Sequence, residues 1–231
     1  MGTAQAANWP VKVGDAETTA AFEPAETPLE DSVYVLAPGA SAMMEHRTML
    51  NLARVFRARG LHTVRFNFMY QALKKGPPDR MPRLMECYAA VVEKIRSEIG
   101  PRHIFLGGHS MGGRTASMLA AEGFACDGIV LLAYPLHPSG QPEKLRDAHL
   151  AQIPVPALCM NGTRDELCQQ DLMQQVVAKL PATWTMHWLE GADHGFRVLK
   201  RSGRTDEDVL NEIGDVGRAW MARVIEGETG S

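Results

Sequence analysis

The residues Gly107-Gly-His-Ser-Met-Gly-Gly113 are the strongest indication of the architecture of this chain. They follow an apolar run at 103–107 that is typical of a buried strand, and they precede a helical pattern at 111–121. Glycines stand two residues before and two residues after Ser110, which lets the backbone turn sharply without a Cβ clash. The stretch therefore predicts a strand, a tight turn and a helix, with the Ser110 hydroxyl lifted above the end of the strand.

Strand-like and helical segments alternate on both sides of this turn. Such alternation is the pattern of a mostly parallel sheet with helices on both faces, which places the chain in the α/β class. The predicted strands are 33–37, 63–68, 103–107, 128–133, 157–161 and 183–189, and the predicted helices are 44–59, 83–99, 111–121, 166–180 and 206–225. We expect one or two antiparallel edge strands within 9–22, and a mobile loop at 71–82 around Gly76-Pro-Pro78.

The composition excludes several classes of protein. Of the 231 residues 45% are hydrophobic, which can fill a core and excludes a disordered protein. Lys and Arg number 24 against 27 Asp and Glu, a formal net charge of −3, and no basic run is long enough to bind a nucleic acid. We expect a single domain over residues 1–231, with 1–31 as an amino-terminal extension that holds the edge strands.

Location and redox state are also predicted from the sequence. Residues 1–10 lack the basic start and apolar core of a secretory signal, and Ala6 breaks the myristoylation pattern. No apolar run is long enough to span a membrane. The cysteines form no CxxC pair, so we expect reduced thiols, no zinc site and a cytoplasmic protein; they are Cys87, Cys126, Cys159 and Cys168.

A serine nucleophile needs a base, and the base needs a carboxylate to orient it. In sheets of this type the acid and the histidine follow the serine in that order, on loops after later strands. Asp165 follows the strand 157–161, and His194 follows the strand 183–189. Two alternatives concern the acid: Asp165 as the cap of the helix predicted from Glu166, and Asp193 as the acid, although neighbouring side chains rarely face each other.

The remaining histidines have other predicted roles. The His109 side chain is expected to turn away from that of Ser110, while structural roles are expected for His62, His103 and His187, and His149 precedes a predicted strand. His46 and His137 follow the carboxyl ends of strands, where ligands collect in α/β sheets, so we expect them to line the substrate pocket together with Tyr134.

Two backbone N–H groups are candidates for the oxyanion hole that acyl transfer requires. The Met111 N–H follows the serine at the positive end of a helix. The second donor should come from the loop after the strand 33–37, where we choose the Ala40 N–H. A plain tight turn at Pro38-Gly39 is the alternative.

A phosphate-binding loop is the competing interpretation of the serine turn. Residues 108–115 nearly spell G-x-x-x-x-G-K-[ST], but Arg114 stands where that loop has lysine. The strand 128–133 also lacks the aspartate that would hold magnesium. Both differences favour the serine interpretation.

Over about residues 32–225 the chain resembles the α/β-hydrolase superfamily, in particular its small dienelactone-hydrolase-like and uncharacterised hydrolase-like branch. The resemblance is carried by five strings: Leu36-Ala-Pro-Gly-Ala40, Gly108-His-Ser-Met-Gly112, Ala133-Tyr-Pro-Leu-His-Pro138, Gly162-Thr-Arg-Asp165 and Gly191-Ala-Asp-His194. It implies Ser110 as nucleophile, His194 as general base and Asp165 as its orienting acid, in a site without a metal or cofactor.

This chain departs from the family pattern in two places. Many relatives carry His-Gly where this chain has Pro38-Gly39, and true dienelactone hydrolases carry cysteine where this chain has Ser110. A dienelactone substrate is therefore not implied.

The expected activity is hydrolysis of a small carboxylic ester or thioester through an acyl-enzyme. No long insertion follows the strand 128–133, so we expect no large cap domain. An open cleft roofed by 134–154 and by 71–82 should then accept a short or flexible acyl group. The alternatives are a non-catalytic interaction protein with the hydrolase fold, or a peptidase or haloperoxidase-like activity on the same triad.

Overall fold

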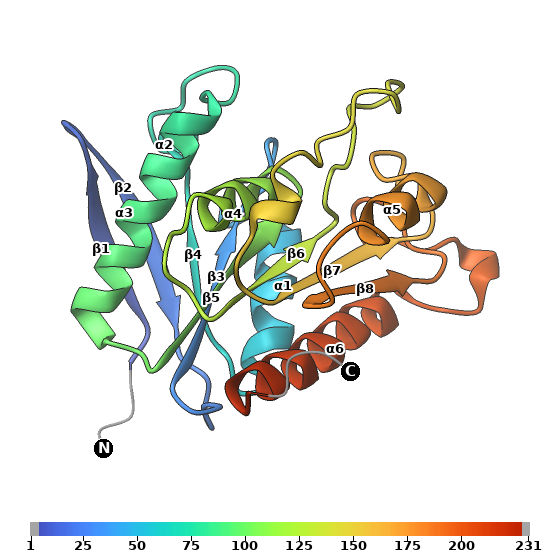
Figure 1. Ribbon diagram of the computed structural model, residues 1–231. Helices are drawn as coiled ribbons and strands as arrows, with labels where there is room; N and C mark the ends of the chain where they lie inside the picture. The colour runs from blue at the N-terminus through green and yellow to red at the C-terminus, as the bar shows by residue number, and fades with distance from the viewer. Residues whose placement is uncertain (1–4, 228–231) are drawn as a thin grey trace.

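The computed structural model describes residues 5–227, in which eight strands form one sheet with helices on both faces (Figure 1). The strands are β1 (Ala7–Val13), β2 (Ala16–Glu23), β3 (Ser32–Ala37), β4 (His62–Phe66), β5 (His103–His109), β6 (Gly128–Leu132), β7 (Ala157–Gly162) and β8 (Trp184–Leu189). The helices are α1 (Arg47–Arg57), α2 (Met69–Ala72), α3 (Met81–Ile99), α4 (Met111–Ala121), α5 (Gln170–Val177) and α6 (Asp206–Ile225). Residues 1–4 and 228–231 lie outside the described residues. The prediction that residues 1–10 hold no secretory signal and the prediction of a single domain over 1–231 both include some of them.

The sheet has the order β1-β2-β4-β3-β5-β6-β7-β8. All pairs from β4 to β8 are parallel, whereas β1 pairs with β2, and β2 with β4, in antiparallel fashion. The predicted mostly parallel α/β sheet is confirmed. The predicted amino-terminal strands are confirmed as well, and β2 joins them to the main sheet through its pairing with β4.

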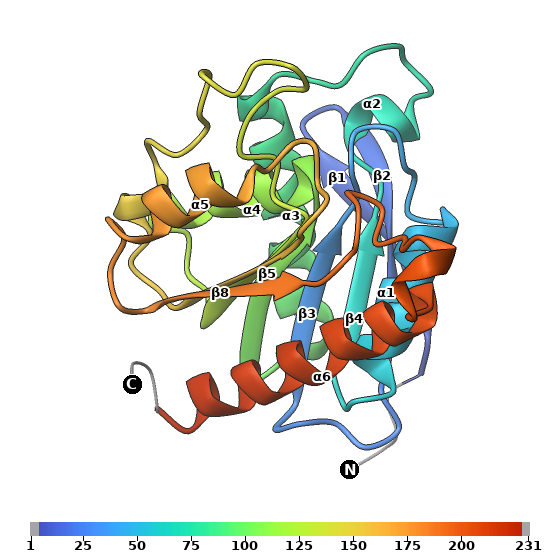
Figure 2. The same cartoon turned by 90° about the vertical axis from the view of Figure 1, so that its right-hand side faces the viewer.

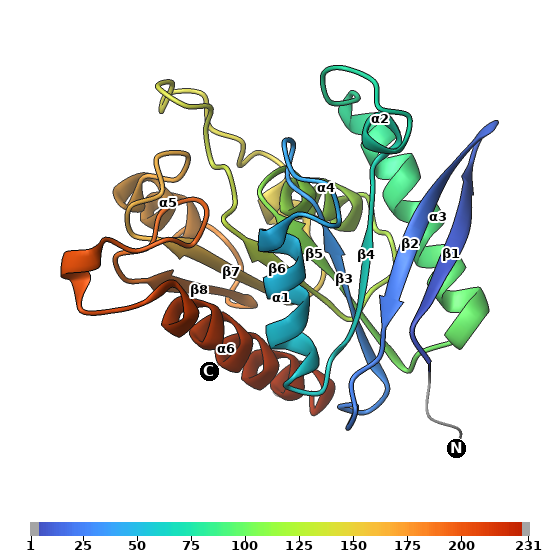
Figure 3. The ribbon, with the colours of Figure 1, turned by 180° about the vertical axis from the view of Figure 1, so that it is seen from behind.

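Helices cover the two faces of the sheet in separate groups. One core joins α3, α4 and α5 to the first face, and the other joins α1 and α6 to the opposite face (Figures 1 and 3). Every residue of β3 and of β6 is buried, because helices cover both faces of the sheet at these central strands. A strand that is covered on both faces must be apolar on both. This explains why these strands are continuous apolar runs in the sequence.

The loops that build the site lie at one edge of the sheet. Because β3 to β8 are parallel, the segments after their carboxyl ends collect there, and α2 and the loop after β6 rise above the same end in Figures 1 and 2. The segment between β6 and β7 holds one short 3-10 turn, Leu150–Gln152, so a large cap is absent from the described part of the chain. Within residues 5–227 no helix is both long and apolar enough to cross a bilayer.

One local prediction was wrong: the helix predicted from Glu166 begins at Gln170 instead, and the preceding Gln169 N–H donates to the His137 Nε2. The loop predicted at 71–82 is shorter than predicted, because its first residues belong to α2 and its last to α3. Within it the Asp79 carboxylate accepts a hydrogen bond from the Tyr70 N–H at 2.9 Å.

Candidate active site

Ser110 occupies a strained turn between β5 and α4. Its backbone has φ 53° and ψ −116°, which costs about 1–3 kcal/mol for a residue other than glycine. The Ser110 N–H donates to the Leu132 carbonyl at 2.8 Å, so the end of β6 holds the turn in place. A Cβ on Gly108 or on Gly112 would collide with the Ala37 backbone, which explains why glycines flank the serine.

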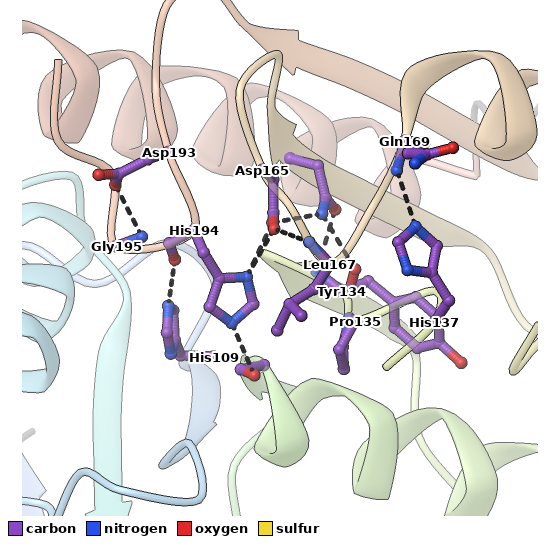
Figure 4. Close-up of polar contacts among 12 residues, drawn as sticks. His109, Tyr134, Pro135, His137, Asp165, Leu167, Gln169, Asp193, His194 and Gly195 are labelled. Carbon is purple, nitrogen blue, oxygen red and sulfur yellow. Dashed lines mark hydrogen bonds and ion pairs between the residues drawn. The ribbon is translucent and has the colours of Figure 1, made fainter. Parts of the chain in front are cut away.

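Ser110, His194 and Asp165 form a continuous chain of hydrogen bonds. Figure 4 labels His194 and Asp165 of this chain. The His194 Nε2 lies 2.9 Å from the Ser110 Oγ, and its Nδ1 lies 2.8 and 2.9 Å from the Asp165 carboxylate oxygens. Because an ionised carboxylate only accepts, the Nδ1 of His194 carries a proton, and in the neutral ring Nε2 is free to accept one. This arrangement can remove the proton of the Ser110 hydroxyl.

The Asp165 carboxylate is held on all sides. Its side chain is fully buried, and besides His194 it accepts from the Leu167 N–H at 2.9 Å and from the Asn161 Nδ2 at 3.1 Å (Figure 4). Asp165 does not cap α5, whose N-cap is Gln169. The carboxylate orientation is therefore fixed by its own loop and by β7.

Asn161 is a site residue that the sequence analysis missed. It is fully buried at the end of β7, where its Oδ1 accepts from the Tyr134 N–H at 3.0 Å and its Nδ2 donates to the Tyr134 carbonyl at 3.0 Å. It thus joins the loop after β6 to the carboxylate of Asp165. An amide at the end of a buried apolar strand, four residues before the acid, was the available signal.

Asp193 shapes the loop that carries His194. Its Oδ1 accepts from the N–H groups of Gly195 and Arg197, both at 2.9 Å. The hydrogen bonds of the Asp193 carboxylate are thus to its own loop, and those of the His194 imidazole are to Asp165 and Ser110.

His109 connects the turn at Ser110 to the loop that carries His194. Its Nε2 lies 2.9 Å from the His194 carbonyl oxygen, which only accepts, so the Nε2 carries the proton. Burial, together with the nearby His194, lowers the pKa of His109 to about 4. His109 therefore remains a neutral donor in the pH range in which most hydrolases are assayed.

This low pKa predicts a pH dependence of stability. The unfolded His109 has an ordinary pKa of 6.5 and binds more protons than the folded one, so its contribution to stability should be lost as pH falls from 6.5 to about 4. The His109→Gln variant should show a shallower loss of unfolding free energy over the upper part of that range. Urea unfolding of wild type and variant at a series of pH values measures this, with His103→Gln on the opposite end of β5 as the control. Equal slopes in wild type and His109→Gln would contradict the prediction.

The two candidate oxyanion donors flank Ser110. Met111 is the first residue of α4, so its N–H has no partner within the helix. On the other side, a Cβ built on Gly39 would lie 3.6 Å from the Ser110 Cβ, which places the loop with Ala40 against the serine turn. Among the hydrogen bonds formed by residues 5–227, neither the Met111 N–H nor the Ala40 N–H donates to a protein acceptor.

The three predicted pocket residues lie in different surroundings. His46 is exposed as the N-cap of α1 and borders a hollow of about 260 Å³ together with Gly195 and Phe196 of the His194 loop. Tyr134 is fully buried, and its hydroxyl donates to the Arg146 carbonyl at 2.6 Å.

The His137 side chain is inside the protein, with 1% of its surface exposed. Its Nδ1 donates to the Pro138 carbonyl at 3.0 Å. Its Nε2 accepts from the Gln169 N–H at 3.3 Å, as Figure 4 shows. His137 thus ties the loop after β6 to the start of α5. A direct contact of His46, His137 or Tyr134 with substrate stays a prediction.

A second serine and histidine are also in contact. The Ser117 Oγ lies 2.8 Å from the His149 Nε2, but the Ser117 hydroxyl donates its only proton to the Arg114 carbonyl, also at 2.8 Å. The His149 Nε2 must therefore be the donor in this pair. Burial and the nearby Arg114 lower the pKa of His149 to about 4. This pair has the geometry of a structural contact, since its histidine offers Ser117 no free acceptor.

The comparisons with known proteins agree on the architecture. A family model described as an alpha/beta hydrolase domain matches residues 30–222. An alpha-beta serine hydrolase homologue from Coxiella burnetii is 19% identical over 91% of this chain and 94% of its own, with a TM-score of 0.73. A serine hydrolase without a lid from Xanthomonas campestris is 18% identical over 94% and 95%, with a TM-score of 0.73. A dienelactone hydrolase from Anabaena variabilis is 16% identical over 95% and 98%, again with a TM-score of 0.73.

Proposed function

Because the chain belongs to the alpha/beta hydrolase family over residues 30–222, we propose that it is a serine hydrolase acting on small carboxylic esters or thioesters. The observation that carries the proposal is the hydrogen-bond chain from the Ser110 hydroxyl through His194 to the buried Asp165 carboxylate. A nucleophile, a base with a free acceptor nitrogen and an orienting carboxylate are the groups that acyl transfer requires.

The proposed reaction proceeds in two halves. The Ser110 Oγ attacks the substrate carbonyl carbon while the His194 Nε2 takes the hydroxyl proton, and the negative charge on the carbonyl oxygen is stabilised by the N–H groups of Met111 and Ala40. Collapse of this intermediate expels the alcohol or thiol, which receives the proton from His194. Water, deprotonated by His194, then attacks the acyl-enzyme, so that the carboxylic acid leaves and Ser110 regains its proton.

The absence of a helical cap between β6 and β7 in the described residues favours a substrate with a small or flexible acyl group. The segment between β6 and β7 holds no helical cap in the described residues, and the Xanthomonas campestris protein of the same fold is described as lacking a lid. An open cleft places few restrictions on one end of the substrate. A peptidase or haloperoxidase-like activity would use the same three side chains and is separated from the proposal by substrate tests.

The test of the proposal is chemical labelling followed by a substrate panel. Fluorophosphonates react with serines that an adjacent histidine activates, so wild-type protein should be labelled and should hydrolyse p-nitrophenyl and CoA esters of short acyl groups faster than those of long ones. Absence of labelling, together with absence of turnover on every ester, would favour the non-catalytic interaction protein.

The pH dependence of turnover tests the base. His194 must be neutral to accept the Ser110 proton, so kcat/KM should fall as pH is lowered from about 8 to about 5, the range in which histidine side chains change charge. His109, with its pKa near 4, stays neutral over this range and does not contribute to the fall. The His194→Ala variant should lose activity at every pH. A wild-type profile that is flat down to pH 5 would contradict a histidine base.

His137→Ala is the matched comparison for His194→Ala. Since His137 ties the loop after β6 to the start of α5, its loss should change the relative rates on acetate, butyrate and longer acyl esters and leave the chemical step in place. A collapse of turnover on all esters, as severe as in His194→Ala at an unchanged melting temperature, would place His137 in the chemical step.

A further inference from the structure

Gln71 of α2 forms hydrogen bonds to the loop after β3, which carries the second candidate oxyanion donor, the Ala40 N–H. Its Nε2 donates to the Gly39 carbonyl at 3.2 Å and to the Ala42 carbonyl at 2.8 Å. Its Oε1 accepts from the Phe68 N–H at 2.9 Å, which fixes the amide in this orientation. The Gln71 side chain is buried, and the residue exposes 7% of its surface, so water does not compete well for these hydrogen bonds.

The direction of the Ala40 N–H follows from that of the Gly39 carbonyl, which accepts from the Gln71 Nε2 and also from the Ala42 N–H at 3.3 Å. The peptide bonds of the described residues are trans, and in a planar trans peptide the carbonyl and the following N–H point in opposite directions. The strand order β4-β3-β5 places the loop after β3 between α2, which follows β4, and Ser110, which follows β5. With the Gly39 carbonyl turned toward Gln71, the Ala40 N–H therefore faces the side of Ser110.

Tyr70 supports the same loop at the next carbonyl. Its hydroxyl donates to the Ala40 carbonyl at 2.6 Å, while its N–H donates to the Asp79 carboxylate. Burial, followed by the charge of Asp79, raises the pKa of Tyr70 to about 12, so the phenol keeps its proton. The Ala40 carbonyl belongs to the peptide after the one that carries the Ala40 N–H, which makes the effect of Tyr70 on that donor indirect.

We propose that Gln71 is a positioning residue that aims the Ala40 N–H at the oxyanion; this inference rests on the proposed hydrolase function. The negative charge on the substrate oxygen develops only as Ser110 attacks. A misdirected donor therefore reduces the stabilisation of the transition state more than the binding of the substrate. Loss of the Gln71 amide should therefore lower kcat and leave KM nearly unchanged.

The experiment compares Gln71→Met, which keeps the length of the side chain without its hydrogen bonds, with Tyr70→Phe, which removes one hydroxyl. We expect kcat to fall by about 10- to 100-fold in Gln71→Met, less than the loss of a whole donor, and by a smaller factor in Tyr70→Phe. A trifluoromethyl ketone, which forms an oxyanion on adding to serine, should bind Gln71→Met more weakly by a similar factor. Gln175→Met, on the exposed face of α5, is the matched control with wild-type kinetics expected.

Several measurements separate positioning from damage to the fold. The melting temperature reports folding, and the acid limb of the pH profile should keep its midpoint because the contacts of His194 are unchanged. If Gln71→Met does not fold, Gln71→Asn, whose amide cannot reach both carbonyls, is measured in its place with the same expected signature. A rise in KM at constant kcat, a shifted acid limb, or a larger loss in Tyr70→Phe than in Gln71→Met would overturn the proposal. Wild-type protein that neither reacts with fluorophosphonate nor hydrolyses any ester would instead refute the hydrolase function, before any variant is compared.

Discussion

Replacing Ser110 with alanine is expected to abolish fluorophosphonate labelling and to lower kcat on any ester substrate by on the order of 10⁶-fold. The variant lacks the only oxygen that the His194 Nε2 faces in the hydrogen-bond chain. The melting temperature should change little, because alanine keeps the Cβ and the Ser110 N–H bond to Leu132 is a backbone contact. Labelling, steady-state kinetics and a thermal melt of the same preparation measure all three quantities.

The chain contains its own control for this experiment. Ser117 also contacts a histidine, but His149 acts as the donor in that pair, so Ser117→Ala should keep both labelling and turnover. Labelling that persists in Ser110→Ala and disappears in a folded Ser117→Ala would show that the nucleophile lies in the second pair.

Replacing Asp165 with asparagine is the second large expected effect, a fall in kcat by about 10⁴-fold. An amide that turns its NH2 group toward the His194 Nδ1 favours the tautomer with the proton on Nε2, which cannot accept the Ser110 proton. It also provides no negative charge to stabilise the imidazolium. Steady-state kinetics on a p-nitrophenyl ester, with the melting temperature as a check on folding, measures the effect.

Asp193→Asn is the matched control, because it changes the neighbouring carboxylate in the same way. The amide oxygen that this substitution leaves in place can still accept from the N–H groups of Gly195 and Arg197, so the loop should keep its form and kcat should fall far less. The opposite ranking of the two variants would make Asp193 the acid.

Sequence signals predict the elements of this fold well where they are strong and local. The limits of α4 and α6 agree with the predicted ones, since a glycine-flanked turn precedes α4 and Thr205 caps α6 through the Asp208 N–H. The order of Ser110, Asp165 and His194 along alternating strands and helices was enough to select three residues that the structure brings within hydrogen-bond distance.

The parts that sequence reasoning missed depend on contacts between distant segments. The Asn161 amide, which donates to Asp165, is itself held by the N–H and the carbonyl of Tyr134, and these contacts exist only once β6 and β7 are side by side. Gln71 lies shortly before a Gly-Pro-Pro stretch that predicts a loop. The carbonyl groups that accept from its amide lie about 30 residues earlier in the chain. Local propensity contains no information on such partners, so the short helix α2 is absent from the elements that the sequence predicts.

The close approach of the serine turn to β3 divides the site into a part that tolerates sequence change and a part that does not. Any side chain at Gly108 or Gly112 would meet the Ala37 backbone, and one at Gly39 would come within 3.1 Å of the His109 ring. Random substitution around Ser110 would therefore mostly yield chains that cannot form the turn at all. The segment 138–148 is half-buried or exposed, so a library aimed at new substrates should be concentrated there, with residues 107–113 left unchanged.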